Sequence, residues 1–104
     1  MQLGYVILYV PGAGEALAFY ERAFGLKRRF AHESGEYGAL DTGTTALAFA
    51  SECLAASHGF PYRRNRGDEE AAGFEVALVT DAVDSAYATA VANGAVAVAP
   101  MPWG

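Results

Sequence analysis

The chain has 104 residues, of which 53% are hydrophobic and 18% are charged. This length supports one domain with a modest core, and the composition excludes a disordered chain. Lys and Arg number 7 against 12 Asp and Glu, so the formal net charge is -5. Nucleic-acid binding needs a basic face. We therefore expect no nucleic-acid partner.

Membrane and export signals are absent from the sequence. No apolar run approaches the ~20 residues that cross a bilayer, and the N-terminus lacks the basic region and cleavage site of a secretory signal. The single cysteine, Cys53, cannot form an internal disulfide, which agrees with a reducing compartment. We expect a cytoplasmic protein with no membrane partner, and a buried or half-buried Cys53 thiol that is not a nucleophile.

The first half of the chain predicts a strand, a helix and three further strands. An apolar run over residues 5–10 predicts the first strand, and Pro11-Gly12 ends it. A helix follows, because apolar residues recur at helical spacing until Gly25; they are Ala13, Ala16, Leu17, Tyr20 and Phe24. Three extended segments joined by short turns, at 30–33, 37–40 and 45–50, favour antiparallel neighbours.

Residues 52–73 show no regular pattern and predict a long surface loop or linker. Two interpretations stay open for it. One is a solvated connection, and the other is a lid over a ligand site, since long loops in compact domains are often functional.

The opening pattern returns after this loop. Residues 74–79 predict a strand, and an apolar stripe ended by Gly94 predicts a helix; the stripe is Val83, Ala86, Tyr87, Ala90 and Val91. A strand over residues 95–99 follows. We therefore expect a single domain, 1–104, with a first module at 1–51, a linker at 52–73 and a partial second module at 74–104. The second copy has fewer strands than the first, so we expect the chain to continue beyond Gly104 or a partner to cover the gap.

Several segments together resemble a known family. They are VILYVPG at 6–12, ALAFYERAFGLKRRF at 16–30, FEVALVTD at 74–81, AYATAVANGA at 86–95 and Pro102-Trp103-Gly104. The chain resembles the glyoxalase, bleomycin-resistance and extradiol dioxygenase superfamily, whose fold is called vicinal oxygen chelate. The resemblance implies an α+β fold of paired βαβββ modules around a cavity, with the second module incomplete here. It also implies a homodimer.

The resemblance places the metal-ligand positions of metal-dependent relatives at Tyr5, Ala48 and Phe74, with a fourth beyond the chain. None of these is an ordinary ligand for a divalent ion. We therefore expect no metal and no cofactor, and we lean against an enzyme. Glu52, Cys53 and His58 match no compact ligand motif. Two readings of Glu75 stay open, a paired carboxylate at a sheet edge or a functional one at the cavity mouth.

The register implied by the resemblance also predicts a pocket. Alternate residues of the first strand face its concave side, while Val6, Leu8, Val10, Leu47 and Phe49 pack under helices. Aromatic residues of the loop and terminus would close the pocket. The predicted ligand-binding residues are Tyr5, Ile7, Tyr9, Ala48, Phe74, Val76, Phe60 and Trp103.

These expectations combine into one function with two alternatives. We predict a metal-free protein that binds a small organic molecule, aromatic or cationic, as in the drug-sequestering branch of the superfamily. Such binding requires no catalytic residue. The first alternative is a metal-dependent glyoxalase-like lyase or dioxygenase, completed by missing C-terminal or partner-chain residues. The second is a module that mainly dimerises.

Overall fold

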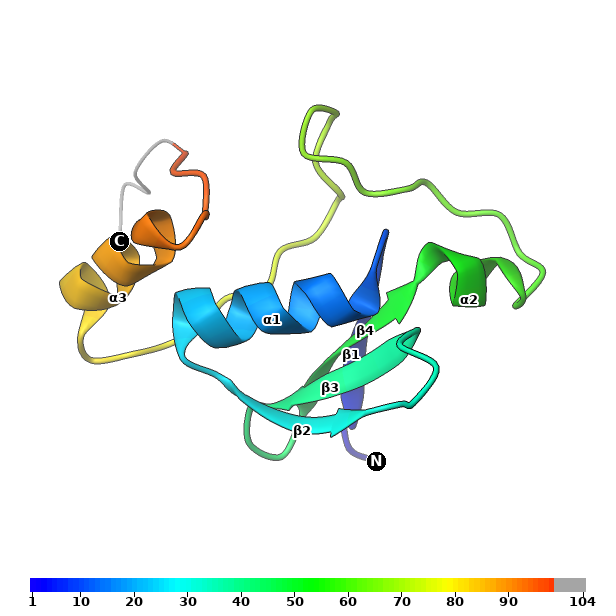
Figure 1. The fold of residues 1–104 in the computed structure, drawn as a ribbon, viewed down its shortest axis with the longest axis horizontal. Coiled ribbons are helices and arrows are strands. Elements are labelled where there is room, and N and C mark those ends of the chain that lie inside the picture. Colours follow the sequence, from blue (N-terminus) through cyan, green and yellow to red (C-terminus); the bar gives the residue numbers. More distant parts are fainter. Residues whose placement is uncertain (99–104) are drawn as a thin grey trace.

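The computed structural model describes residues 1–98. In chain order its elements are β1 (Tyr5–Val10), α1 (Ala13–Phe24), β2 (Lys27–Ala31), β3 (Tyr37–Asp41), β4 (Ala46–Ser51), α2 (Glu52–Ala56) and α3 (Val83–Ala92). Figure 1 shows α1 across one face of the sheet and α3 beside the C-terminal end of α1. The predicted α+β fold is confirmed, with one complete βαβββ unit followed by an incomplete second region.

The four strands form one sheet in the order β1-β4-β3-β2. β4 pairs in parallel with β1 and antiparallel with β3, and β3 pairs antiparallel with β2. The short turns therefore join antiparallel neighbours, as predicted. Because β1 and β4 run in the same direction, their C-terminal ends lie at the same end of the sheet, and α2 begins there.

The helix α1 begins and ends at glycines. Gly12 precedes it and contributes no side-chain hydrogen bond to the free N–H groups of the first turn. At the other end Gly25 has a φ of 68°, and its N–H donates to the carbonyl of Glu21 at 3.1 Å. This left-handed conformation favours glycine and confirms the predicted helix end.

The main core lies between α1 and the sheet. Leu17 packs with Leu40, Leu47 and Phe49, which are all nearly inaccessible to solvent. Gly38 makes this close approach possible, because a Cβ there would collide with the Leu17 side chain. The partly buried residues that complete the cluster are Val6, Leu8, Val10, Ala16, Tyr20 and Leu26. The residues predicted to pack under a helix on this side do so.

The second region differs from the prediction in its strands. Residues 74–79 form no strand, and neither do residues 95–98, where the described part of the predicted 95–99 strand lies. An apolar run becomes a strand only when a neighbour accepts and donates its backbone hydrogen bonds. The predicted helix is confirmed as α3, and Gly94 follows it with a φ of 107°.

The segment predicted as a loop also contains a short helix. In α2 the N–H of Leu54 donates to the Ser51 side chain at 3.3 Å, and Ala55 is the buried residue. A helix of one turn and a half is too short to show in the hydrophobic period. Cys53 lies on the outer side of α2, so the prediction of a buried or half-buried thiol was wrong.

Within residues 1–98, no helix combines the length and the apolar character that crossing a membrane requires.

Candidate functional site

The face of the sheet opposite α1 carries alanines between larger apolar side chains. Strand pairing places Tyr5 beside Ala46, Ile7 beside Ala48, and Tyr9 beside Ala50. Alternate residues of a strand share a face, so these side chains point away from α1. We call this surface the open face; its residues are Tyr5, Ile7, Tyr9, Phe30, Tyr37, Ala39, Ala46, Ala48 and Ala50.

The small and the large side chains of the open face differ in their exposure to solvent. The alanine methyls are almost fully covered, with Ala48 at 0% exposure. The larger side chains above them remain half exposed, at 57% for Tyr5, 46% for Ile7 and 48% for Phe30. The result is an apolar, partly aromatic platform that faces solvent, a kind of surface that marks interaction sites.

Two residues of the open face were missed from the sequence. Phe30 pairs with Ala39 and Tyr37 with Ala50, so both aromatic rings lie on the platform. A register shift between Arg28 and Phe30 breaks the two-residue alternation of β2, which hides Phe30 from a parity argument. For Tyr37 a sequence signal was available, because it lies two residues before Ala39 in the same predicted strand and so shares a face with it.

The tyrosines of the open face influence each other. Burial raises the pKa of the Tyr37 phenol, and the nearby Tyr5 raises it further. The Tyr37 phenol is therefore neutral at physiological pH and can donate a hydrogen bond. Asp41, at the end of β3, is paired with Arg29 at 3.2 Å.

The long loop returns to the open face at Tyr9. The Tyr9 ring lies 4.9 Å from the Tyr62 ring and 6.4 Å from the Phe60 ring, measured between centroids. The Tyr9 hydroxyl is 3.4 Å from Nδ1 of His58, and the Asn65 side chain donates to the Tyr9 carbonyl at 3.3 Å. These contacts hold residues 58–65 against the C-terminal end of β1.

The structure groups some of the predicted ligand-binding residues and separates others. Ile7, Tyr9 and Phe74 line one small hollow of about 190 Å³. Val76 does not join them, because it lines a different cavity on the α1 side of the sheet. Trp103 lies outside the described residues.

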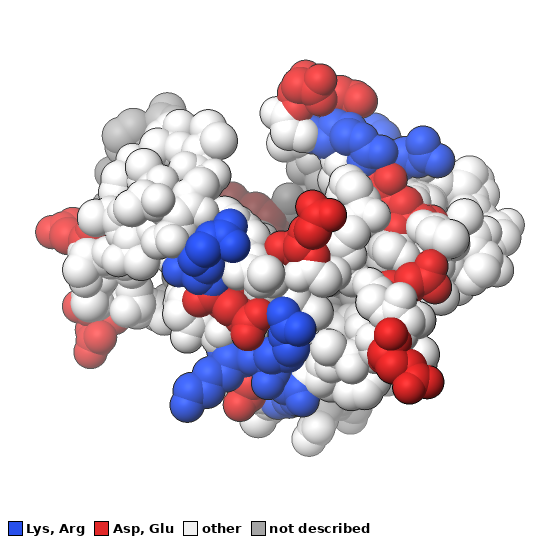
Figure 2. Space-filling view, viewed as in Figure 1, with Lys and Arg blue, Asp and Glu red and all other residues white. Residues whose placement is uncertain are grey.

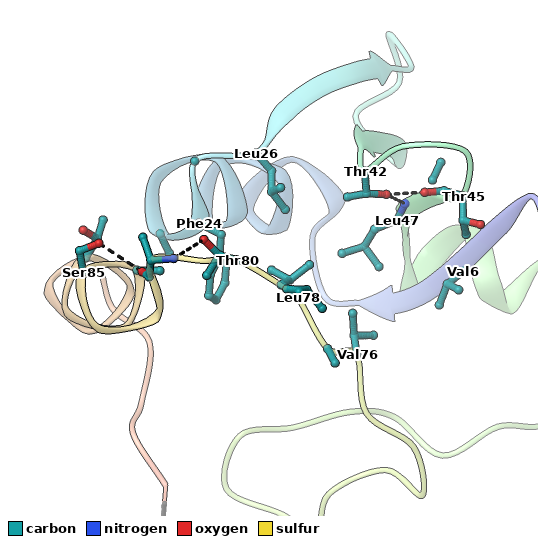
Figure 3. A pocket seen from close by; sticks show the side chains of 18 residues that line it. Val6, Phe24, Leu26, Thr42, Thr45, Leu47, Val76, Leu78, Thr80 and Ser85 are labelled. Atoms are coloured by element: carbon teal, nitrogen blue, oxygen red, sulfur yellow. Dashed lines mark hydrogen bonds between the residues drawn. The ribbon is translucent and has the colours of Figure 1, made fainter. Parts of the chain in front are cut away.

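That second cavity, which we call the large cavity, has a volume of about 680 Å³. It lies between the first unit and the region 76–89 (Figure 3), so no local pattern in the sequence predicted it. Apolar and hydroxyl-bearing side chains line it, and none of its lining residues is charged. They include Val6, Phe24, Leu26, Thr42, Thr45 and Leu47 from the first unit, and Val76, Leu78, Thr80, Ser85, Ala86 and Thr89 from the second region.

Four of the seven basic residues form ion pairs, with three acidic partners. Figure 2 shows Lys and Arg beside acidic residues on the visible face. Arg66 donates to Glu52 at 2.6 Å, and Arg28 donates to Glu21 at 2.6 Å. The hydrogen bond from Arg66 lowers the pKa of the Glu52 carboxyl, so Glu52 is an ion-pair partner and not a candidate base.

The cysteine and histidine of the same segment do not form a reactive site with Glu52. A hydrogen bond with Glu36 raises the pKa of the Cys53 thiol, which disfavours the nucleophilic thiolate. His58 instead contacts Tyr9. Among residues 1–98, no three His, Cys, Asp or Glu side chains are grouped to hold a metal ion.

A family model agrees with this architecture. The model described as the Glyoxalase/Bleomycin resistance protein/Dioxygenase superfamily matches residues 2–104. The chain belongs to this superfamily. The resemblance inferred from the sequence motifs is thereby confirmed.

Several solved structures share the fold. A gene product from Arabidopsis thaliana matches with a TM-score of 0.69 and 22% identity, over 97% of this chain and 78% of that one. TioX from Micromonospora sp. ML1 matches with a TM-score of 0.63 and 23% identity, over 100% of this chain and 84% of that one. A glyoxalase/bleomycin resistance protein/dioxygenase family enzyme from Burkholderia phytofirmans PsJN matches with a TM-score of 0.57 and 22% identity, over 90% and 74%. No curated protein sequence matches the chain.

The resemblance implied metal-ligand positions at Tyr5, Ala48 and Phe74, and the chemistry of these three side chains does not fit a metal ion. Ala48 projects a methyl group from the open face, and Tyr5 lies on the neighbouring strand. Phe74 lines the small hollow. A divalent ion prefers imidazole, carboxylate or thiolate donors, whereas these positions offer one phenol, one methyl and one phenyl group.

Proposed function

We propose that this superfamily member binds a small organic molecule, aromatic or cationic, on its open face without a metal. The observation that carries the proposal is the half-exposed platform of Tyr5, Ile7 and Phe30, with Ala48 where a chelating side chain would project. Aromatic rings stack on other flat rings and attract cations to their faces. The net charge of -5 adds an attraction for a cationic ligand.

The predicted residues have distinct roles in this proposal. Tyr5, Ile7 and Ala48 form the base on which the ligand lies. Tyr9, together with Phe60 and Phe74, contacts the part of the ligand nearest the long loop. Val76 is left out of this set because it lines the other cavity, and Trp103 stays a predicted contact that lies outside the described residues. We also propose a homodimer, in which the second copy covers the part of the platform that the ligand leaves exposed.

The experiment uses a flat cationic probe, 9-aminoacridine, titrated calorimetrically in the presence of EDTA. We expect saturable binding that Tyr5→Ala weakens by roughly tenfold, because one stacking partner is removed. The matched control is Tyr87→Ala, since Tyr87 on α3 is exposed to the same degree, 58% against 57% for Tyr5. That control should leave the affinity unchanged.

Two results would overturn the proposal. Equal affinity for the Tyr5→Ala and Tyr87→Ala proteins would place the probe elsewhere. Binding that disappears with EDTA and returns with added zinc, manganese or iron would show metal dependence. The second result would instead support the metal-dependent lyase or dioxygenase.

A further inference from the structure

We propose that the large cavity is a second ligand site, which takes a neutral, mainly apolar molecule carrying a hydroxyl group. Its volume of about 680 Å³ lies within the range of roughly 300–1,000 Å³ that small-molecule sites occupy. This cavity is distinct from the site that the superfamily resemblance implied, because the Tyr5 and Ala48 side chains lie on the opposite face of the sheet.

The sheet separates this cavity from the open face. Val6 and Leu47 pair with each other on β1 and β4, and both side chains point to the α1 side. Ile7 and Ala48, one residue further along each strand, point to the other side. Of the open-face residues, Ala46 also lines the large cavity, whereas Tyr5, Ile7 and Ala48 do not, so substitutions at Tyr5 and at Ala86 test the two sites separately.

The lining favours an uncharged occupant. The walls come from Leu26 and Phe24 at the end of α1, and from Val76 and Leu78 in the extended segment (Figure 3). A charged group placed here would find no opposite charge among the lining residues.

The hydroxyl groups of the lining define what polar group the ligand carries. Thr42 donates to the carbonyl of Thr45, Thr45 donates to that of Leu3, and Ser85 donates to that of Ala82. These three hydroxyl hydrogens are used, so the oxygens are left mainly as acceptors.

The Thr80 hydroxyl differs from these three because, within residues 1–98, it accepts a hydrogen bond and does not donate one. Its oxygen accepts from the N–H of Ala82 at 3.2 Å, and no acceptor for its hydroxyl hydrogen lies among the described residues. A ligand alcohol both donates and accepts, so it can donate to the Ser85 oxygen and accept from Thr80, which lie at the same end of the cavity (Figure 3). An alkane offers neither interaction, and a ketone offers only the second.

The experiment compares 1-octanol with octanoate and octylammonium at neutral pH, using calorimetry and ligand-observed NMR on the full chain. We expect saturable binding of 1-octanol, at least tenfold tighter than that of either ion. Intermolecular NOEs should connect the octanol methyl to the methyl groups of Leu26 and Leu78. Equal or tighter binding of an ion, or NOEs to Ile7 of the open face, would overturn the proposal.

Two alanines on one helix supply matched variants. Ala86 lines the cavity, whereas Ala88 is exposed two residues further along α3 and does not line it. Ala86→Phe should fill the cavity and weaken octanol binding at least tenfold, and Ala88→Phe should leave it unchanged. Circular dichroism checks the fold of both, and the NOEs on the unsubstituted protein test the site without any variant. An equal effect of the two substitutions would contradict the cavity as the site.

Discussion

The first unit and the region 74–98 carry similar sequence patterns and reach different degrees of burial. In α1, the residues Ala13, Leu17 and Ala23 are buried, whereas in α3 only Ala90 is. The apolar stripe predicted for α3 is largely exposed; Val83 is at 61%, Tyr87 at 58% and Val91 at 42%. An amphipathic helix buries its stripe only where a second layer lies under it. α1 has the sheet, and α3 contacts the side of α1.

The strands show the same difference. β1 and residues 74–79 are both short, apolar and followed by a helix after a turn. β1 is paired along its whole length with β4, from Tyr5 to Val10. Residues 74–79 have no such neighbour within the described chain, so they form no strand. Apolar character alone therefore does not determine a strand.

The largest expected effect comes from comparing a buried ring beneath α1 with an exposed ring on α3. Phe49 is 1% exposed in the core beneath α1, so Phe49→Ala should lower the free energy of unfolding by about 3–5 kcal/mol. Tyr87→Ala on α3 should lower it by less than ~1 kcal/mol, because the ring is already exposed. Urea denaturation measures both. Equal losses would show that α3 is packed in solution as tightly as α1.

A pair of glycines sharpens the account of the first unit. Gly38→Ala places a methyl against Leu17 and should destabilise by about 1–3 kcal/mol through overpacking. Gly14→Ala, in α1 with nothing within 4 Å of the new methyl, should stabilise by roughly 0.5–1 kcal/mol through helix propensity. Thermal unfolding gives the signs. A stable Gly38→Ala protein would mean that α1 packs further from β3.

The smallest effect concerns Glu52, where the first unit meets the long loop. Arg66 lowers the pKa of Glu52, so the ion pair contributes stability at neutral pH. This contribution is lost as the pH falls through the lowered pKa. Glu52→Gln should therefore be slightly less stable than the parent at pH 7 and indistinguishable from it in acid.

The control for that measurement is Glu70→Gln, whose carboxylate forms no ion pair in the described part of the chain. Its difference from the parent should be near zero at both pH values. Urea midpoints measured across the acid range would contradict the role of Glu52 if the two substitutions behaved alike.

Local patterns accounted for much of the fold. The helical spacing of Leu17 and Tyr20 predicted α1, Gly25 and Gly94 marked the helix ends, and the short turns predicted antiparallel strands. These features act between residues close in the chain, so they can be read without the fold. The superfamily could also be recognised, because its motifs lie in these same segments.

The candidate sites depended on more distant contacts. Phe30 joined the open face through a register shift, and Phe60 met Tyr9 through a loop whose course no pattern specified. The large cavity exists only where residues 76–89 approach the first unit.

The sequence by itself therefore determined α1, α3, the presence of four strands in the first unit and the superfamily. Only the tertiary structure decided that β1 pairs with β4, which apolar faces are covered and where hollows remain. The physical reason is that a helix turn or a glycine end is stabilised by neighbours within a few residues. A sheet pairing or a cavity is defined by groups that are distant in the chain, and the sequence pattern of one segment carries no information about its partner.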